Sequence, residues 1–144
     1  MNKYKLSETE IHQLIDLAFE ARENAYIPYS NFAVGAALLT ASGTIYLGCN
    51  VESCSYTPTT CAERVAVLKA VSEGEKEFVA IAVVGGPKDI SELLDIASPC
   101  GVCRQLIYEF GPDTLIIGAK SKEDYYLLPI SELLPKGFGP HNLL

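Results

Sequence analysis

The spacing of apolar residues predicts an amphipathic helix near the start of the chain. The residues that recur at helical intervals on one face are Ile11, Leu14, Ile15, Ala18 and Ala25. Ser7 followed by Glu10 has the sequence of a capping box, in which the two residues satisfy free backbone N–H groups of the first turn. We therefore predict a helix from about Glu8 to Asn24, and Pro28 with its polar neighbours ends the helical pattern.

Short runs of apolar and β-branched residues predict buried strands. The predicted strands are Ala33–Leu39, Thr44–Cys49, Phe78–Val84, Thr114–Ala119 and Tyr125–Leu128. The turn-forming residues 41–43 join the first two into a hairpin. The stretch 85–97 has no clear periodicity, and we assign it no element.

Two further helices begin beside cysteines. Val65, Leu68 and Val71 recur at helical spacing in a helix predicted over Cys61–Ser72. Ser98 and Pro99 suit the N-cap and first position of a helix that runs to about Phe110. A short helical turn is expected over 131–134. The alternation of strands and helices favours an α/β domain, and the length of 144 residues favours a single domain over 1–144.

Composition and charge argue against several classes of protein. Apolar residues make up 49% and charged residues 20%, which is typical of an ordinary globular domain. The net charge is −7 and the basic residues are scattered, so binding to a polynucleotide or to an anionic membrane is not expected. No apolar run approaches the length of a membrane helix, and the opening residues do not resemble a signal peptide. We expect a cytoplasmic protein with reduced thiols.

Three cysteines have the spacing of a metal site. Cys61 opens one predicted helix, and Cys100 and Cys103 open another, where backbone N–H groups and the helix dipole favour the thiolate that binds zinc. Neither histidine has a suitable spacing to complete the set. Three protein ligands leave a fourth position free for water, which is the arrangement of a catalytic zinc site.

Charged neighbours of these cysteines suggest the remaining chemistry. Glu63, two residues after Cys61, is placed in a first helical turn and is a candidate to move protons to and from the metal-bound water. Zinc with three thiolates carries a net charge of −1, which the two helix N-termini partly offset. Arg64 and Arg104 each follow a site residue and are candidates to donate hydrogen bonds to the sulfurs.

These motifs, taken together, resemble those of the cytidine deaminase family, in its small three-cysteine branch. The stretches that match in order are AYIPYSNFAVGAALL, CNVE, CAER, SPCGVCRQ and ELLPKGFGP, and they cover nearly the whole chain. The resemblance implies a three-layer α/β/α fold around a mixed five-stranded sheet. It also implies zinc-dependent hydrolytic deamination of cytidine and 2′-deoxycytidine in pyrimidine salvage, with one Zn²⁺ per chain.

The resemblance also assigns roles to individual residues. The implied zinc ligands are Cys61, Cys100 and Cys103, with Glu63 as the catalytic residue. The implied substrate contacts are Phe32 and Ala62 at the base, Asn50 and Glu52 at the ribose, and Tyr56 and Phe138, of which the last two are lent by neighbouring subunits of a homotetramer.

Three other interpretations remain open at this point. Cys100 and Cys103 alone also suit a zinc knuckle or a redox pair. A deaminase of another substrate, such as a blasticidin-type nucleoside, shares the CAE and PCxxC motifs. A zinc-stabilised binding module without turnover would not need Glu63. Cys49 and Cys54 are expected to be small buried hydrophobes and not ligands.

Overall fold

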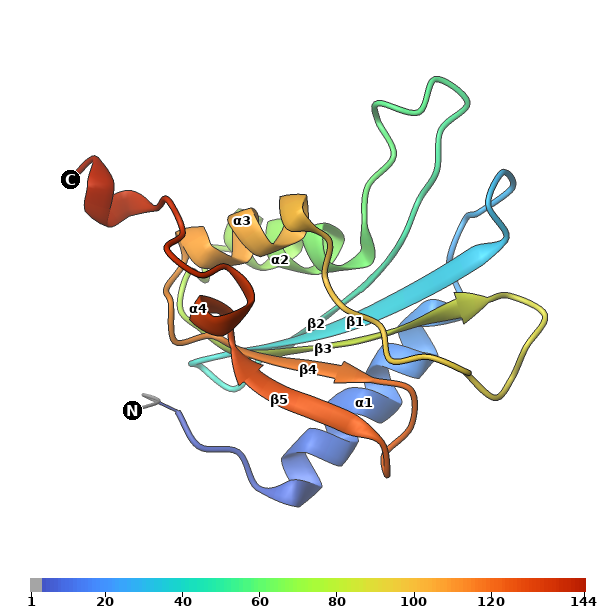
Figure 1. Ribbon diagram of the computed structural model, residues 1–144, viewed down its shortest axis with the longest axis horizontal. Helices are drawn as coiled ribbons and strands as arrows, with labels where there is room; N and C mark the ends of the chain where they lie inside the picture. Colours follow the sequence, from blue (N-terminus) through green and yellow to red (C-terminus); the bar gives the residue numbers. More distant parts are fainter. Residues whose placement is uncertain (1–3) are drawn as a thin grey trace.

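A mixed five-stranded sheet forms the middle layer of the computed structural model, which describes residues 4–144 (Figure 1). The strands are β1 (Phe32–Thr40), β2 (Ile45–Cys49), β3 (Phe78–Pro87), β4 (Leu115–Ala119) and β5 (Tyr125–Pro129). Their order is β2-β1-β3-β4-β5, and β3 and β4 are parallel while the other neighbours are antiparallel. The predicted hairpin and the predicted mixed sheet are therefore confirmed.

Helices cover both faces of the sheet and so complete the three layers. The helices are α1 (Glu8–Arg22), α2 (Ala62–Ser72), α3 (Gly101–Glu109), the short α4 (Ile130–Leu133) and the 3-10 helix η1 (Pro140–Asn142). The helix α1 packs on one face, and α2, α3 and α4 lie on the other (Figure 1). Among residues 4–144, every helix falls short of the length and apolarity that a bilayer crossing demands.

The first helix forms for the reasons that its sequence indicates. Ser7 accepts a hydrogen bond from the Glu10 backbone, and the Glu10 carboxylate accepts one from the Ser7 backbone. Ile11, Leu14, Ile15 and Ala18 of the predicted stripe are buried, whereas Ala25 lies beyond the helix and is only partly buried. Leu6 packs against the same core cluster as Ile11. The helix ends at Arg22, two residues earlier than predicted.

The last long helix starts later than its sequence suggests. Its N-cap is Cys100, whereas Ser98 was the expected cap. Ser98 lies outside the helix, and its hydroxyl lies 2.7 Å from the hydroxyl of Tyr126. The strand β3 also runs three residues beyond its predicted end, because Pro87 at its end pairs with Phe32 at the start of β1.

Arg22 connects the end of α1 to the strands β1 and β3. Its guanidinium is buried and donates to the carbonyl of Ala33 at 2.9 Å, to Gly86 at 3.0 Å and to Pro87 at 2.7 Å. A buried cation needs such hydrogen bonds to offset the loss of its hydration. Arg22 therefore fixes the start of β1 against the end of β3, a function that the sequence analysis did not assign.

Gly48 lets α2 approach the sheet at backbone distance. A Cβ atom at Gly48 would collide with the carbonyl oxygen of Ala62 and would lie 2.7 Å from the nitrogen of Ala66. The first turn of α2 is thus pressed onto β2, which fixes the position of Cys61 and Glu63 relative to the sheet.

Candidate active site

Three cysteines from two helix starts converge at one point. Cys61 is the N-cap of α2, Cys100 is the N-cap of α3, and Cys103 lies in the first turn of α3. The Sγ atom of Cys100 is 3.9 Å from that of Cys61 and 3.7 Å from that of Cys103. All three sulfurs lie within 4.8 Å of one another.

The spacing of the sulfurs fits a tetrahedral zinc ion. A Zn–S bond of about 2.3 Å implies that two sulfurs of a regular tetrahedron are separated by about 3.8 Å. The two Sγ–Sγ distances that involve Cys100 bracket this value. Among residues 4–144 no histidine or carboxylate joins the cluster, so the protein supplies three ligands and leaves one position for water or substrate.

Arg64 supports a negative charge on the sulfurs. Its Nη2 lies 3.9 Å from Cys61 Sγ and donates to the Thr59 carbonyl at 3.1 Å, and its Nε is buried without a partner. The pKa of Cys61 is lowered to about 5, first by a hydrogen bond from Cys103 and then by Arg64. The hydrogen bond to Cys61 and the burial of Cys103 raise the pKa of the Cys103 thiol.

Arg104 has a different position from the one expected. Its Nε donates to the carbonyl of Pro99 at 2.7 Å, and its Nη1 donates to the carbonyl of Leu133 at 2.8 Å. The expected contact with the sulfurs is therefore replaced by two backbone contacts. They join the residue before Cys100 to the end of α4.

Glu63 is the buried acid of the site. Its side chain is only 4% exposed, and its Oε2 lies 3.8 Å from Cys103 Sγ. Burial is the main reason that its pKa is raised to about 7, and the negative charge of Cys61 adds to this effect. A carboxyl group with a pKa near neutrality can both accept and donate a proton, which suits general acid–base catalysis.

A cavity of about 330 Å³ opens beside the thiols and Glu63. It is lined by Phe32, Val34, Asn50, Cys61, Ala62, Glu63, Val83, Ile96, Ala97, Ser98 and Cys100. Its mixture of apolar walls and a few polar groups is typical of a small-molecule site. The structure thus brings Phe32, Asn50 and Ala62 into one cavity with Cys61, Cys100 and Glu63.

The predicted ribose contacts are also engaged with the backbone. Asn50 Oδ1 accepts from the Val34 nitrogen and its Nδ2 donates to the Phe32 carbonyl, both at 2.9 Å. Glu52 lies outside the set that lines the cavity, and its Oε1 accepts from the nitrogens of Tyr29 and Ser30 at 3.0 and 3.1 Å. Together with the Ser30 hydroxyl, these contacts lower the Glu52 pKa.

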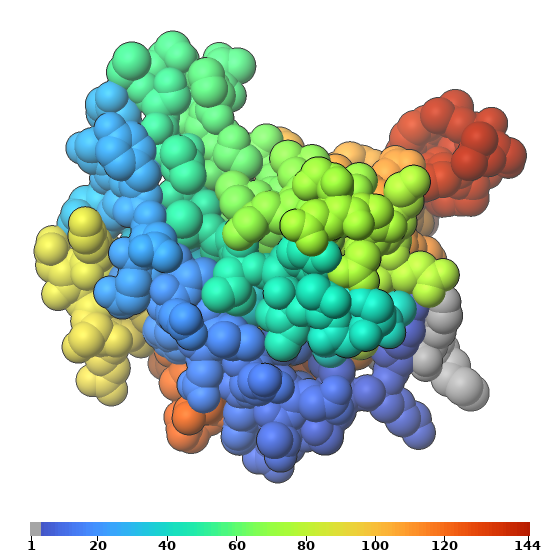
Figure 2. Space-filling view, turned by 180° about the vertical axis from the view of Figure 1, so that it is seen from behind, coloured from blue at the N-terminus to red at the C-terminus, as the bar shows by residue number. Residues whose placement is uncertain are grey.

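Tyr56 and Phe138 do not line the cavity formed by residues 4–144 of one chain. Tyr56 is 73% exposed and packs edge-on against Tyr29, and Phe138 is 58% exposed while its carbonyl accepts from Gln105 at 2.8 Å. Figures 1 and 2 show the loop between β2 and α2 and the segment after α4 at opposite ends of the molecule. Each aromatic residue is thus available to another chain.

Several lining residues escaped the sequence analysis. Ile96 and Ala97 lie in the stretch 85–97 that lacked periodicity, and Ser98 was recognised only as a predicted helix N-cap. Val34 and Val83 were recognised only as strand residues. The remaining cysteines are not ligands, although Cys54 is exposed where a buried position was expected, and Cys49 is only partly buried.

The chain matches a family of zinc-dependent deaminases. The family model described as "Cytidine and deoxycytidylate deaminase zinc-binding region" matches residues 8–119. A cytidine deaminase of Sporosarcina psychrophila is 44% identical over 138 residues, which are 93% of this chain and 95% of that protein. A blasticidin-S deaminase of Bacillus cereus is 32% identical over 119 residues, which are 81% of this chain and 84% of that protein.

Solved structures lead to the same family. The crystal structure of cytidine deaminase from Burkholderia pseudomallei has a TM-score of 0.80 and 45% sequence identity to this chain. The match covers 88% of this chain and 98% of that one. The zinc-binding family model, the three-cysteine cluster and the fold agree, and the chain belongs to the cytidine deaminase family.

Proposed function

We propose that this protein is a zinc-dependent deaminase that hydrolyses cytidine and 2′-deoxycytidine to the corresponding uridines and ammonia. The observation that carries the proposal is the buried Glu63 carboxyl group beside three convergent thiols at a nucleoside-sized cavity. The relatives at 44% and 45% identity carry the name cytidine deaminase. A zinc-stabilised module without turnover would not need to bury an acid at this point.

Each part of the reaction has a residue to perform it. Cys61, Cys100 and Cys103 would hold the zinc ion, which would activate the water that hydrolysis consumes. Glu63 would take one proton from that water and deliver it to N3 of the ring. It would then take the second proton from the new C4 hydroxyl and deliver it to the departing amine. The new bond joins the water oxygen to C4, and the bond that breaks joins C4 to the exocyclic nitrogen.

The cavity walls are suited to hold the nucleoside. Phe32 and Val34 offer apolar surface for the base, and the first turn of α2 offers the Ala62 backbone. Asn50 keeps one amide proton and one acceptor position that its two backbone contacts do not use. The backbone contacts of Glu52 use only Oε1, so Oε2 can accept further hydrogen bonds. These groups suit the hydroxyls of a ribose.

Free nucleosides are expected to be better substrates than nucleotides. Among the residues of the described chain that line the cavity, none is a lysine or an arginine, and the protein as a whole carries −7. A phosphate dianion would lose hydration without gaining a cation. For CMP we expect a kcat/KM on the order of 100-fold below that for cytidine.

The measurement is the loss of ultraviolet absorbance and the release of ammonia by zinc-loaded protein with cytidine, CMP, cytosine and blasticidin S. Equal efficiency on cytidine and CMP would contradict the nucleoside assignment. Turnover of blasticidin S in place of cytidine would favour the activity named for the Bacillus cereus relative. The absence of turnover on every substrate would contradict the enzyme proposal itself.

A homotetramer with shared active sites is part of the proposal. The outward-facing Tyr56 and Phe138 support it, as do the exposed Leu68 of α2 and Val102 of α3, which line a groove of about 680 Å³ between these helices. Exposed apolar surface of this kind is typical of contacts between subunits. Closed symmetry would let each chain lend an aromatic side chain to a neighbour.

Phe138→Ala is expected to raise KM for cytidine roughly tenfold while zinc content stays at one per chain, because it removes an aromatic face and no ligand. Leu143→Ala, an exposed residue of the same tail, is the matched control and should leave KM unchanged. Light scattering of the wild type should give four times 15.6 kDa. Mixing Phe138→Ala chains with Glu63→Gln chains should restore complete sites, and a fully active monomer would rule out the sharing.

A further inference from the structure

The polar contact between β5 and the cavity wall is not explained by zinc binding or proton transfer. The hydroxyls of Tyr126 and Ser98 lie 2.7 Å apart, and either oxygen can be the donor. Ser98 lines the cavity together with Glu63 and Cys100. The contact therefore joins the far edge of the sheet to the wall of the proposed substrate site, across 28 positions of the chain.

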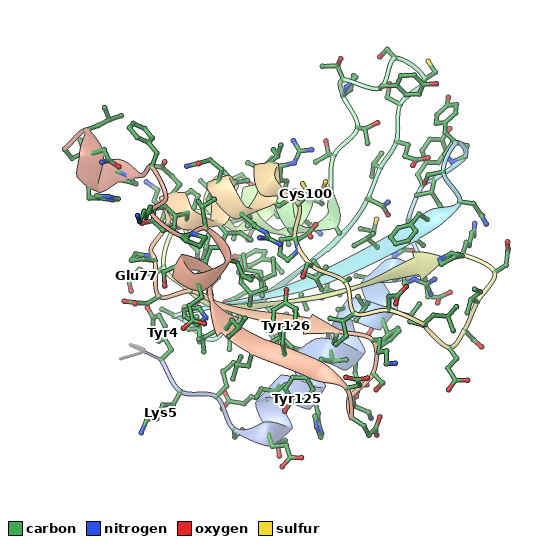
Figure 3. All side chains as sticks on the ribbon, in the orientation of Figure 1. Tyr4, Lys5, Glu77, Cys100, Tyr125 and Tyr126 are labelled. Atoms are coloured by element: carbon green, nitrogen blue, oxygen red, sulfur yellow. The ribbon has the colours of Figure 1, made fainter. Side chains whose placement is uncertain are left out.

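The register of the sheet places Tyr126 beneath this wall. Gly118 of β4 pairs with Val83 of β3 on one side and with Tyr126 of β5 on the other, so the three residues form one row across the sheet. Val83 lines the cavity. Tyr126 belongs to the core on the α2 and α3 side of the sheet, whereas its neighbour Tyr125 packs with the core under α1 (Figure 3).

Gly118 provides the space for this arrangement. A Cβ atom at Gly118 would collide with the Tyr126 ring and would lie 2.6 Å from the carbonyl oxygen of Ala97. The ring and the Ala97 backbone thus share the surface that a side chain would fill. The absence of a side chain at position 118 allows the Tyr126 hydroxyl to reach Ser98.

Two side chains hold residues 98 and 99, at the end of the cavity wall. Tyr126 holds the Ser98 hydroxyl, and Arg104 donates to the carbonyl of the next residue, Pro99. Cys100 follows directly. Because the segment 88–100 contains neither helix nor strand, side-chain contacts of this kind determine where its residues stand in the cavity.

We propose that Tyr126 is a positioning residue for substrate binding, which acts by fixing Ser98 in the wall of the cavity. The inference rests on the proposed function, since it requires that the nucleoside occupies this cavity. Tyr126 does not contact the reacting atoms. Its hydroxyl orients Ser98 so that the wall is complete before the substrate arrives, which lowers the entropic cost of binding.

The test compares Tyr126→Phe, Ser98→Ala and the double variant with the wild type, all loaded with zinc. The phenylalanine ring still fills the space over Gly118, so folding is preserved. We expect KM for cytidine to rise roughly fivefold or more in Tyr126→Phe, with kcat within about twofold of the wild type and unchanged zinc content. Ser98→Ala should behave alike, and the double variant should be no worse than either single one, because both remove the same contact.

Tyr125→Phe is the matched control, since it removes a hydroxyl from the adjacent residue on the opposite face of the sheet. It should leave KM unchanged. The inference is overturned if KM of Tyr126→Phe stays within twofold of the wild type, if the two losses multiply in the double variant, or if the loss comes with less zinc. A wild type that does not deaminate cytidine contradicts the proposed function, whereas an active wild type with an unchanged Tyr126→Phe contradicts only this inference.

Discussion

Glu63→Gln is expected to keep one zinc per chain and to lose at least about 10³-fold in kcat with cytidine. The amide has nearly the shape of the carboxyl group and fits the same buried position, but it cannot accept and return a proton. Zinc content by metal analysis, thermal unfolding and steady-state kinetics on the same preparation measure the three properties together.

Glu73→Gln is the control for this experiment, because Glu73 caps the other end of the same helix and is exposed. It should retain wild-type kcat. A Glu63→Gln protein that keeps a tenth of the wild-type rate would contradict the proton-transfer role. An inactive variant that has also lost its zinc would indicate that Glu63 acts in metal binding and not in proton transfer.

Cys100→Ser is expected to hold well under half an equivalent of zinc and to lose at least about 10³-fold in activity. A serine hydroxyl stays protonated at neutral pH and is a poor replacement for a thiolate. The melting temperature should also fall, because zinc binding joins the starts of α2 and α3 and its free energy contributes to folding.

Cys54→Ser separates this effect from a general effect of losing a thiol, since Cys54 is exposed and lies outside the cluster. It should hold one zinc and keep full activity. Chelation of the wild type should remove activity, and added zinc should restore it. Full zinc content in Cys100→Ser would show that the cluster does not bind the metal as described.

Local sequence signals predicted most of the secondary structure. The Ser7 and Glu10 pair marked the start of α1, because a capping box acts within one helical turn. The strands β1, β3 and β4 were visible because each is a run of mostly buried apolar residues. The zinc cluster was predictable because Cys61 and Cys100 each stand at the start of a helix, where backbone N–H groups favour a thiolate. Cys103 lies in the first turn of the same helix as Cys100.

Contacts between distant residues were not predictable in the same way. The start of α3 was placed too early, because nothing near Ser98 reveals that Tyr126 engages its hydroxyl. Arg104 follows Cys103 directly, yet the helix turns its guanidinium toward Pro99 and Leu133. These positions depend on tertiary packing, which overrides local preference.

The close contact at Gly48 decides how the cavity can be enlarged by protein engineering. On the α2 side the backbone of the first turn is pressed against the sheet, so the helix cannot move to gain volume. Ile96 and Val83, which also line the cavity, carry removable methyl groups. Libraries aimed at bulkier nucleosides should vary those two positions and leave Gly48 and the first turn of α2 unchanged.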